Sequence, residues 1–446
     1  MKYICTNLTL PYGGRWRGLY RLSLIVAVLI VPFAMHAQSK AWTLDECINY
    51  ALDHNIEVQQ RINKQRVAEN TLEDSKNAWK PVVDAQLSQD LTLNKAQSGY
   101  DFLSYDRTNT TAQIDASMPL YTFGRLKYKK ISDEFSLKAV AEDLRYSQKQ
   151  VEINVIAGYL QVLYNRTEVK VAQEKLDAST STLKQTKIFY DEGKKPKGDV
   201  VQAEATVSED EYTLLKAKND VKLSLIRLAQ LLNLNDIEGF DVADIADDNV
   251  QIPTIDFAGS IEKYPSVIAA KYRIESAENQ IKLAKSDFMP TLSLTGTAGN
   301  QYSILFNQST PSLWTQLKNR YNLIVGLNLK YNLFNGGATK RKVSLAQINK
   351  VDAQLSLEES KQQIHHDIQN AYYDALTARD KQISAEKAAR LAKESLGYVE
   401  SSYQAGRATI FDLVQSQQHW LQNLEESVRS KYDYILKNKI LEIYQR

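Results

Sequence analysis

The chain has 446 residues, with 55 lysines and arginines against 53 aspartates and glutamates, so its formal net charge is +2. A charge this close to zero gives no electrostatic reason to expect a nucleic-acid partner. The two cysteines, Cys5 and Cys47, are too few for a disulfide framework or a cysteine-based metal site. At roughly 150 residues per domain, the length allows about three domains.

The first 37 residues have the pattern of a secretory signal peptide. Basic residues between Lys2 and Arg21 precede an apolar run over residues 22–34, and Ala37 ends a plausible cleavage segment. A signal anchor is the alternative interpretation, but the apolar run is shorter than the ~20 residues that a membrane-spanning helix needs. The sequence therefore predicts an exported chain.

The rest of the chain consists of two tandem copies. The segment that ends at Gly124 is similar to the one that ends at Gly337, and the segment around Gly193 is similar to the one around Gly406. Both pairs are separated by 213 residues. The predicted domains are a signal peptide at residues 1–37, a first repeat at 38–234, an acidic segment at 235–260 and a second repeat at 261–446.

The acidic segment 235–260 contains neither lysine nor arginine. Its charge and Pro253 indicate a solvated connection between the two copies, with room for a short strand. A functional acidic site is the alternative interpretation of this segment.

Each copy has two segments in which apolar and polar side chains alternate. In chain order, the predicted strands cover about residues 82–93, 110–121, 290–300 and 321–334. Alternation over about ten residues gives a strand one apolar and one polar face. Because four strands cannot close a membrane barrel, two explanations remain: a sheet packed against helices in a soluble protein, or a barrel shared by several chains.

Long helical patterns follow the strands in both copies. After Gly124 and Gly337 the sequence has no proline for tens of residues, and a helix of about 68 residues would be ~100 Å long. Such a helix needs a coiled-coil partner, which the following segment supplies. Apolar residues recur there at heptad spacing: Val200, Val207, Leu214, Val221 and Leu228. The sequence of each copy therefore predicts a long helical hairpin, with its tip near Gly193 in the first copy and near Gly406 in the second.

Aromatic residues lie near both ends of the predicted strands. They are Trp79, Tyr121, Phe123, Phe288 and Phe334 at one end and Trp314 at the other. Membrane barrels carry such aromatic girdles at both interfaces, although aromatic residues at the ends of a soluble sheet would give the same pattern. The pattern favours the barrel. Two chains would give eight strands and three would give twelve, and a conduit needs the wider twelve-stranded interior.

The ordered set of segments resembles the TolC-like outer-membrane efflux proteins. The resemblance covers essentially the whole mature chain and is carried by residues 42–55, Pro81, Pro290, residues 333–337 and residues 403–412. It implies an α+β membrane protein with an internal two-fold repeat. Three chains would form a twelve-stranded barrel in the outer membrane of a Gram-negative bacterium, and long antiparallel helical hairpins would form a coiled-coil barrel in the periplasm.

The resemblance also implies a function. Such a protein would be the passive exit duct of a tripartite efflux or type I secretion system, surrounded by outer-membrane lipid and docked with a periplasmic adaptor and an inner-membrane pump. It would have no catalytic activity, cofactor, metal or nucleic-acid partner, and the sequence does not specify its cargo. The implied adaptor contacts lie at the helical tips, at Gly193, Lys194, Gly406 and Arg407.

The resemblance further implies a gate at these tips. Tyr403 falls on a gate tyrosine, Asp199 on an aspartate that helps to hold the tip closed, and Asp412 on an acidic residue of the aperture. The sequence departs from the family where Ala408 occupies the position of the gate arginine, which leaves Arg407 as the candidate partner of Asp199. Capping of a helix N-terminus is the alternative role for either aspartate.

Two other classes of protein fit the sequence less well. An enzyme would need a metal-ligand cluster, a phosphate-binding glycine loop or a nucleophile elbow, and His365 and His366 lie instead in a helical pattern without ligand spacing. A periplasmic coiled-coil adaptor or structural protein without a pore would share the helical hairpins. It would not need four strands with one apolar face each.

Overall fold

The computed structural model describes residues 41–93, 95–98, 101–104, 106–234, 237–245, 252, 256–306 and 309–446. The predicted signal peptide at residues 1–37 and part of the acidic segment 235–260 lie outside these residues. The helices, in chain order, are α1 (Leu44–His54), α2 (Ile56–Asn77), α3 (Arg125–Asp191), α4 (Lys197–Leu232), α5 (Phe257–Lys263), α6 (Pro265–Ser286), α7 (Leu313–Asn319), α8 (Ala338–Gln404) and α9 (Ile410–Gln445). The strands are β1 (Val82–Thr92), β2 (Lys95–Ser98), β3 (Asp101–Ser104), β4 (Arg107–Tyr121), β5 (Thr291–Leu305) and β6 (Tyr321–Lys330).

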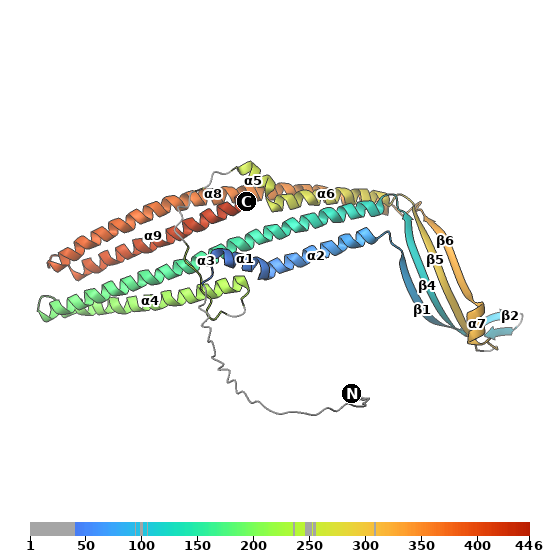
Figure 1. Ribbon diagram of the computed structural model, residues 1–446, viewed down its shortest axis with the longest axis horizontal. Helices are drawn as coiled ribbons and strands as arrows, with labels where there is room; N and C mark the ends of the chain where they lie inside the picture. The colour runs from blue at the N-terminus through green and yellow to red at the C-terminus, as the bar shows by residue number, and fades with distance from the viewer. Residues whose placement is uncertain are drawn as a thin grey trace, which may run out of the picture. The chain divides into compact units, whose positions relative to one another are not determined.

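The two sequence repeats fold into helices of matched length. The helices α3 and α8 have 67 residues each, α4 and α9 have 36 each, and α2 and α6 have 22 each. Both 67-residue helices follow a glycine in the left-handed region, Gly124 with φ 84° and Gly337 with φ 77°, which a residue without a Cβ atom adopts at little cost. In Figure 1, α3 and α4 form one antiparallel hairpin, and α8 and α9 form the other.

The sheet has the strand order β1–β4–β5–β6, with all neighbours antiparallel, and β2 pairs with β3 in a separate hairpin. The register places Ala85 opposite Ile114, Ile114 opposite Ala298, and Ala298 opposite Leu323. Because side chains alternate between faces along each strand, this register places the apolar sides of all four strands on one face.

The ends of the strands differ from the sequence prediction. The strands β4 and β5 are longer than the predicted segments 110–121 and 290–300, because they pair with each other as far as Arg107 and Leu305. The prediction of a strand over 321–334 is wrong at its end. The strand β6 stops at Lys330, since its partner β5 begins opposite that residue and offers no further backbone to pair with.

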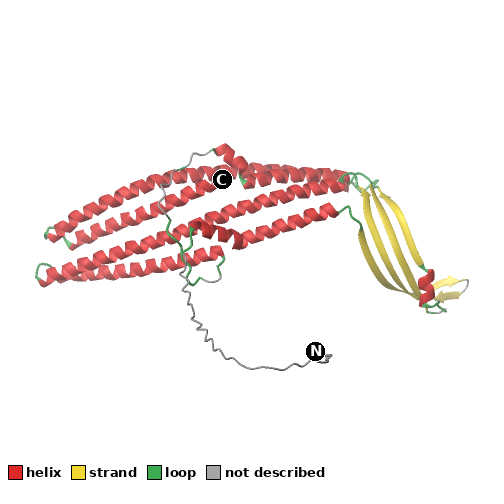
Figure 2. Cartoon of the chain, in the orientation of Figure 1, coloured by secondary structure: helices red, strands yellow, loops and turns green. Residues whose placement is uncertain are grey.

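The long helices all lie beyond one end of the four-stranded sheet (Figures 1 and 2). In the described part of the chain, the helix that packs on the sheet is the short α7, against β5. None of the long helices therefore covers a face of the sheet in the described chain, and the alternative of a sheet packed against the chain's own long helices does not describe this fold. No helix among the described residues is both long and apolar enough to cross a lipid bilayer.

The largest hydrophobic core lies where α1, α3 and α4 meet the start of the acidic segment. Tyr159 of α3 is buried there, and its hydroxyl donates to the carbonyl oxygen of Trp42 at 3.0 Å. Val242, only 1% exposed, forms a β-bridge with Trp42, and the Asp241 carboxylate pairs with Arg166. The prediction of a solvated connection is thus wrong around Asp241 and Val242, because apolar and ionic contacts fix these residues to the core, whereas residues 237–239 are exposed.

Candidate functional site

The apolar face of the sheet is largely exposed. Its side chains on β6, including Leu323, Val325 and Leu327, are 68–70% exposed, and Leu87 on β1 is 75% exposed. Contiguous apolar surface of this kind marks a region that contacts lipid or another protein. The face therefore needs an apolar partner outside the single chain.

The opposite face of the sheet is polar. Asp115 on β4 accepts hydrogen bonds from Gln113 Nε2 at 2.7 Å and from Thr297 Oγ1 at 2.7 Å. Asp84 on β1 lies directly opposite Asp115 in the register. Like charges in this position destabilise a strand pair, and burial in an apolar environment would increase that cost. This face is suited to water.

The six candidate girdle residues lie at two levels. Five lie where the strands join the long helices and are 40–88% exposed: Trp79, Tyr121, Phe123, Phe288 and Phe334. Trp314, 79% exposed, lies on α7, which connects β5 to β6 and packs against β5. In Figure 1, α7 lies at the end of the sheet that is away from the long helices. The sheet thus has exposed aromatic side chains near both of its ends.

At the helical tips, Tyr403 connects the two hairpins. Its side chain is 1% exposed, and its hydroxyl lies 3.1 Å from Thr186 Oγ1 on α3. The ring also contacts Lys195, whose Nζ atom lies 4.8 Å from the ring centroid. Gln417 on α9 donates to Thr182 Oγ1 at 3.2 Å. Two buried hydrogen bonds between uncharged groups therefore join α3 to α8 and α9, and we call these four residues (Thr182, Thr186, Tyr403 and Gln417) the tip latch.

The other gate candidates are not brought together within one chain. Asp199 is half-buried in the first turn of α4, Arg407 is exposed before α9, and no hydrogen bond or ion pair joins them in the described structure. Asp412 Oδ2 instead accepts hydrogen bonds from the Thr409 hydroxyl at 2.6 Å and the Thr409 amide at 2.8 Å. These bonds lower the pKa of Asp412. Within a single chain, Asp412 therefore forms a capping box with Thr409, the N-cap residue of α9.

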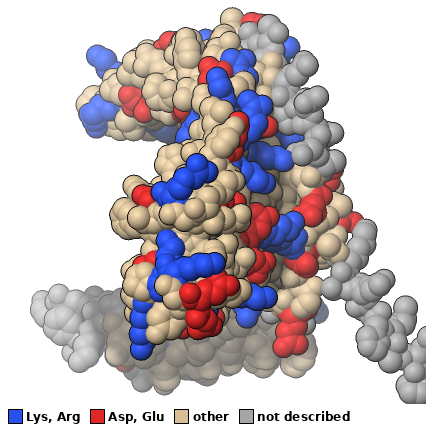
Figure 3. Space-filling model, turned by 90° about the vertical axis from the view of Figure 1, so that its left-hand side faces the viewer, with Lys and Arg blue, Asp and Glu red and all other residues tan. Residues whose placement is uncertain are grey.

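The predicted adaptor contacts all lie in the exposed loops at the tips. Gly193 and Gly406 have φ angles of 75° and 72°, so each turn uses the left-handed region that favours glycine. Lys194 pairs with Glu192 at 2.7 Å, whereas Arg407 is exposed. Figure 3 shows that basic and acidic side chains are interspersed over this end of the molecule. The tips therefore offer a mixed, polar surface.

The sequence prediction missed the partners of Tyr403 in the tip latch. A signal was present, because Thr182 and Thr186 are four residues apart and lie on one side of a helix. The partner of Thr186 is 217 residues away in the sequence, and helical periodicity does not identify a contact of that range.

The prediction also missed Glu168, a half-buried carboxyl group on α3 near α9. Burial, followed by repulsion from Glu425 on α9, raises the pKa of Glu168 to about 7, while a hydrogen bond with Tyr164 acts in the opposite direction. Arg429 on α9 also faces Tyr164. The Glu168 Oε1 atom is buried and has no hydrogen-bond partner in the described structure. Ionisation of Glu168, which occurs around pH 7, therefore places an unfavourable charge in the contact between the hairpins.

Glu168→Gln is expected to raise the melting temperature at pH 8 and to change it little at pH 5. Free glutamate has a pKa of 4.5, so between pH 4.5 and 7 the folded protein holds a proton that the unfolded chain has released. Stability therefore falls as the pH rises through this window. Thermal unfolding at both pH values measures the effect, with Glu174→Gln, an exposed site on α3, as the control. Equal melting of Glu168→Gln and wild type at pH 8 would contradict it.

Comparison with protein families identifies one that matches both repeats. The sequence model of the family described as "Outer membrane efflux protein" matches residues 47–234 and 260–441. The matched residues make up most of the chain and leave out most of the acidic segment.

Two named relatives are similar to this chain over most of their length. The outer membrane protein TolC of Vibrio cholerae is 25% identical over 420 residues, which cover 92% of each chain. The outer membrane efflux protein BepC of Brucella suis is 20% identical over 377 residues, which cover 84% of this chain and 79% of BepC.

Solved structures share the fold. The CmeC outer membrane channel of Campylobacter jejuni superposes with a TM-score of 0.76 at 17% identity, covering 90% of this chain and 85% of CmeC. VceC, an outer membrane protein of Vibrio cholerae, superposes with a TM-score of 0.72 at 18% identity, covering 90% of this chain and 96% of VceC. Since the family match spans both repeats and these structures have the same fold, the chain belongs to the outer membrane efflux protein family.

Proposed function

We propose that three copies of this chain form a passive conduit through the outer membrane, with the long helices in the periplasm. The observation that carries the proposal is the open four-stranded sheet, which has an exposed apolar face, a polar opposite face and no long helix over either in the described chain. Three such sheets make twelve strands. A barrel of eight would have an interior nearly filled by side chains.

Apolar stripes on the helices support the assembly of several chains. On α4, Tyr212 and Leu215 are 68% and 58% exposed, and on α8, Leu345, Ile348 and Leu355 are 55–63% exposed. Residues at these spacings share one side of a helix. The stripes face away from the hairpin partners, so burial against a neighbouring subunit would remove them from water.

The second part of the proposal concerns partners. The family to which the chain belongs supports a role in a tripartite efflux or secretion system, in which the tips around Lys194 and Arg407 dock with a periplasmic adaptor and an inner-membrane pump. Both residues lie in exposed turns. Photo-crosslinking from either position in intact cells tests the docking. Capture of nothing but lipid or further copies of this chain would contradict it.

Conductance measurements test the conduit itself. We expect the detergent-extracted protein to migrate as a heat-sensitive trimer and to insert into planar bilayers as discrete, ohmic channels. Planar bilayers that receive the same detergent without protein provide the control. A protein that is released without detergent and produces no conductance would contradict the proposal and would support the pore-less coiled-coil alternative.

A further inference from the structure

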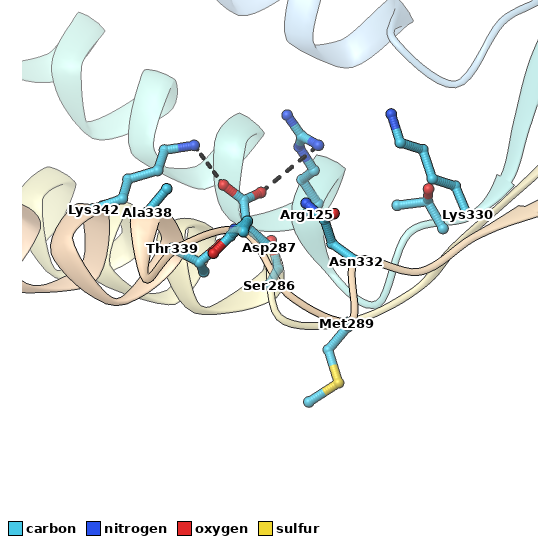
Figure 4. A pocket seen from close by; sticks show the side chains of 11 residues that line it. Arg125, Ser286, Asp287, Met289, Lys330, Asn332, Ala338, Thr339 and Lys342 are labelled. Carbon is cyan, nitrogen blue, oxygen red and sulfur yellow. Dashed lines mark hydrogen bonds and ion pairs between the residues drawn. The ribbon is translucent and has the colours of Figure 1, made fainter.

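A cleft of about 360 Å³ lies where the sheet joins the helices and collects cationic side chains from three elements (Figure 4). Arg125 begins α3, Lys330 ends β6 and Lys342 lies near the start of α8. Asp287, directly after α6, is the acidic residue among the described lining residues. The cleft therefore holds three positive charges and one negative charge.

Asp287 compensates the positive charge only in part. Its Oδ1 atom lies 3.7 Å from Arg125 Nη1, and its Oδ2 atom accepts a hydrogen bond from Lys342 Nζ. The side chain of Lys330 is exposed and has no hydrogen bond or ion pair within the described residues. The cleft is left with an excess of two positive charges. The contacts of the Asp287 carboxylate show that the cationic side chains of the cleft can bind an anionic oxygen.

The start of α8 adds to the positive electrostatic potential of the cleft. Gly337 precedes the helix and supplies no side-chain cap, and the first-turn residues Ala338 and Thr339 line the cleft. The N-terminus of a helix carries a partial positive charge, and here the Ala338 amide already donates to the Asn335 carbonyl oxygen at 3.2 Å. The partial charge therefore favours an anion in the same space as the three cationic side chains.

The cleft opens on the polar side of the sheet. Lys330 lies opposite Thr291 in the register, and the period of two places it on the same face as Asn328. In Figure 4, the side chains of Arg125, Lys330 and Lys342 extend to one side of the chain, whereas Met289 points to the other. In the conduit proposed above, this polar side is the water-filled interior.

We propose that this cleft is an anion-binding site for a phosphate-type oxyanion, present three times around the inner wall of the conduit. Lysine binds phosphate as a point charge, arginine adds a fork of donors, and bonds between charged groups are the stronger kind. Inside the conduit this oxyanion belongs to a soluble molecule. The head group of a phospholipid reaches the cleft only if the cleft opens towards the membrane edge, so the source of the anion also tests which way the cleft opens. The position of the site rests on the proposed function, but the chemistry of the cleft does not.

Inorganic pyrophosphate provides the test. Titration calorimetry on the full-length protein in dodecyl maltoside, which contains no phosphate, should show binding that weakens at least tenfold in the double variant Lys330→Gln/Lys342→Gln. Lys318→Gln removes the same charge from α7, outside this lining, and should bind like wild type. Asp287→Asn should bind several-fold more tightly, because it removes the competing carboxylate. A misfolded variant could not produce this gain.

Native mass spectrometry distinguishes the two sources. Phosphatidylglycerol that is retained by wild type and lost from the double variant would assign the site to lipid, and pyrophosphate binding without such retention would assign it to a soluble anion. Equal pyrophosphate affinity and equal lipid retention in all variants would overturn the site. Channel conductance should persist in the double variant, so a failure of anion binding is separate from a failure of the conduit.

Discussion

Val325→Arg is expected to prevent the assembly of stable oligomers, whereas Ile324→Arg, at the preceding position, should permit it. Val325 lies in the middle of β6 on the apolar face and is 70% exposed. Ile324 lies opposite Thr297, on the polar face that also carries Asp115. An arginine on the lipid face of a barrel costs about 2–4 kcal/mol at the centre of the bilayer, and each trimer would carry three. On the polar face the same side chain meets water and a carboxylate.

The fraction of unheated protein that migrates as an oligomer, together with the amount in the outer membrane, measures this difference. The two variants make the same chemical change at adjacent positions of one strand, so they differ only in the face that receives the charge. Normal assembly of Val325→Arg would contradict the assignment of the apolar face to lipid. Equal failure of both variants would indicate that β6 tolerates arginine on neither face.

Tyr403→Ala is expected to open the helical tips and to raise single-channel conductance several-fold. Loss of a large buried side chain costs about 3–5 kcal/mol, and the contact of Tyr403 with Thr186 exists only while the two hairpins lie together. Each 1.4 kcal/mol taken from the closed arrangement shifts the equilibrium about tenfold towards the open one. Tyr403→Phe removes one hydrogen bond, about 1 kcal/mol, and should have an intermediate effect.

Tyr398→Ala is the matched control for the tip latch. Tyr398 lies on the same helix but is 69% exposed, so its loss should leave the closed tips unchanged. Planar-bilayer recordings of the four proteins, wild type included, measure the conductance. If Tyr403→Ala conducts like Tyr398→Ala, the hydrogen-bonded latch does not hold the tips together.

The strands and the long helices could be predicted because their signals are local. Alternation around Ile114 and along β6 fixes the faces of the strands, and the glycines Gly124 and Gly337 fix the points where helices begin. The ends of strands depend on a partner. The strand β6 ends at Lys330 because its partner β5 starts opposite that residue. The sequence of β6 alone carries no information about where β5 starts.

The candidate site could be predicted only in part, because it depends on contacts between distant segments. Tyr403 was identified through the family, but its contact with Thr186 requires the packing of α3 on the second hairpin. The expected pairing of Asp199 with Arg407 does not occur within the described chain. The capping role of Asp412 is local and follows from Thr409 three residues earlier. The short helix α7 is held by Gln316, whose side chain bonds to the backbone of Ser303.

The equal lengths of α3 and α8 restrict which insertions and deletions in the gene are compatible with the fold. One inserted residue rotates everything beyond it by about 100° and displaces it by about 1.5 Å. An insertion in one 67-residue helix would turn its heptad contacts away from the neighbouring hairpin and leave the two turns at different heights. We therefore expect insertions and deletions to preserve the fold when they occur as matched events in both halves, or in the segments that connect them.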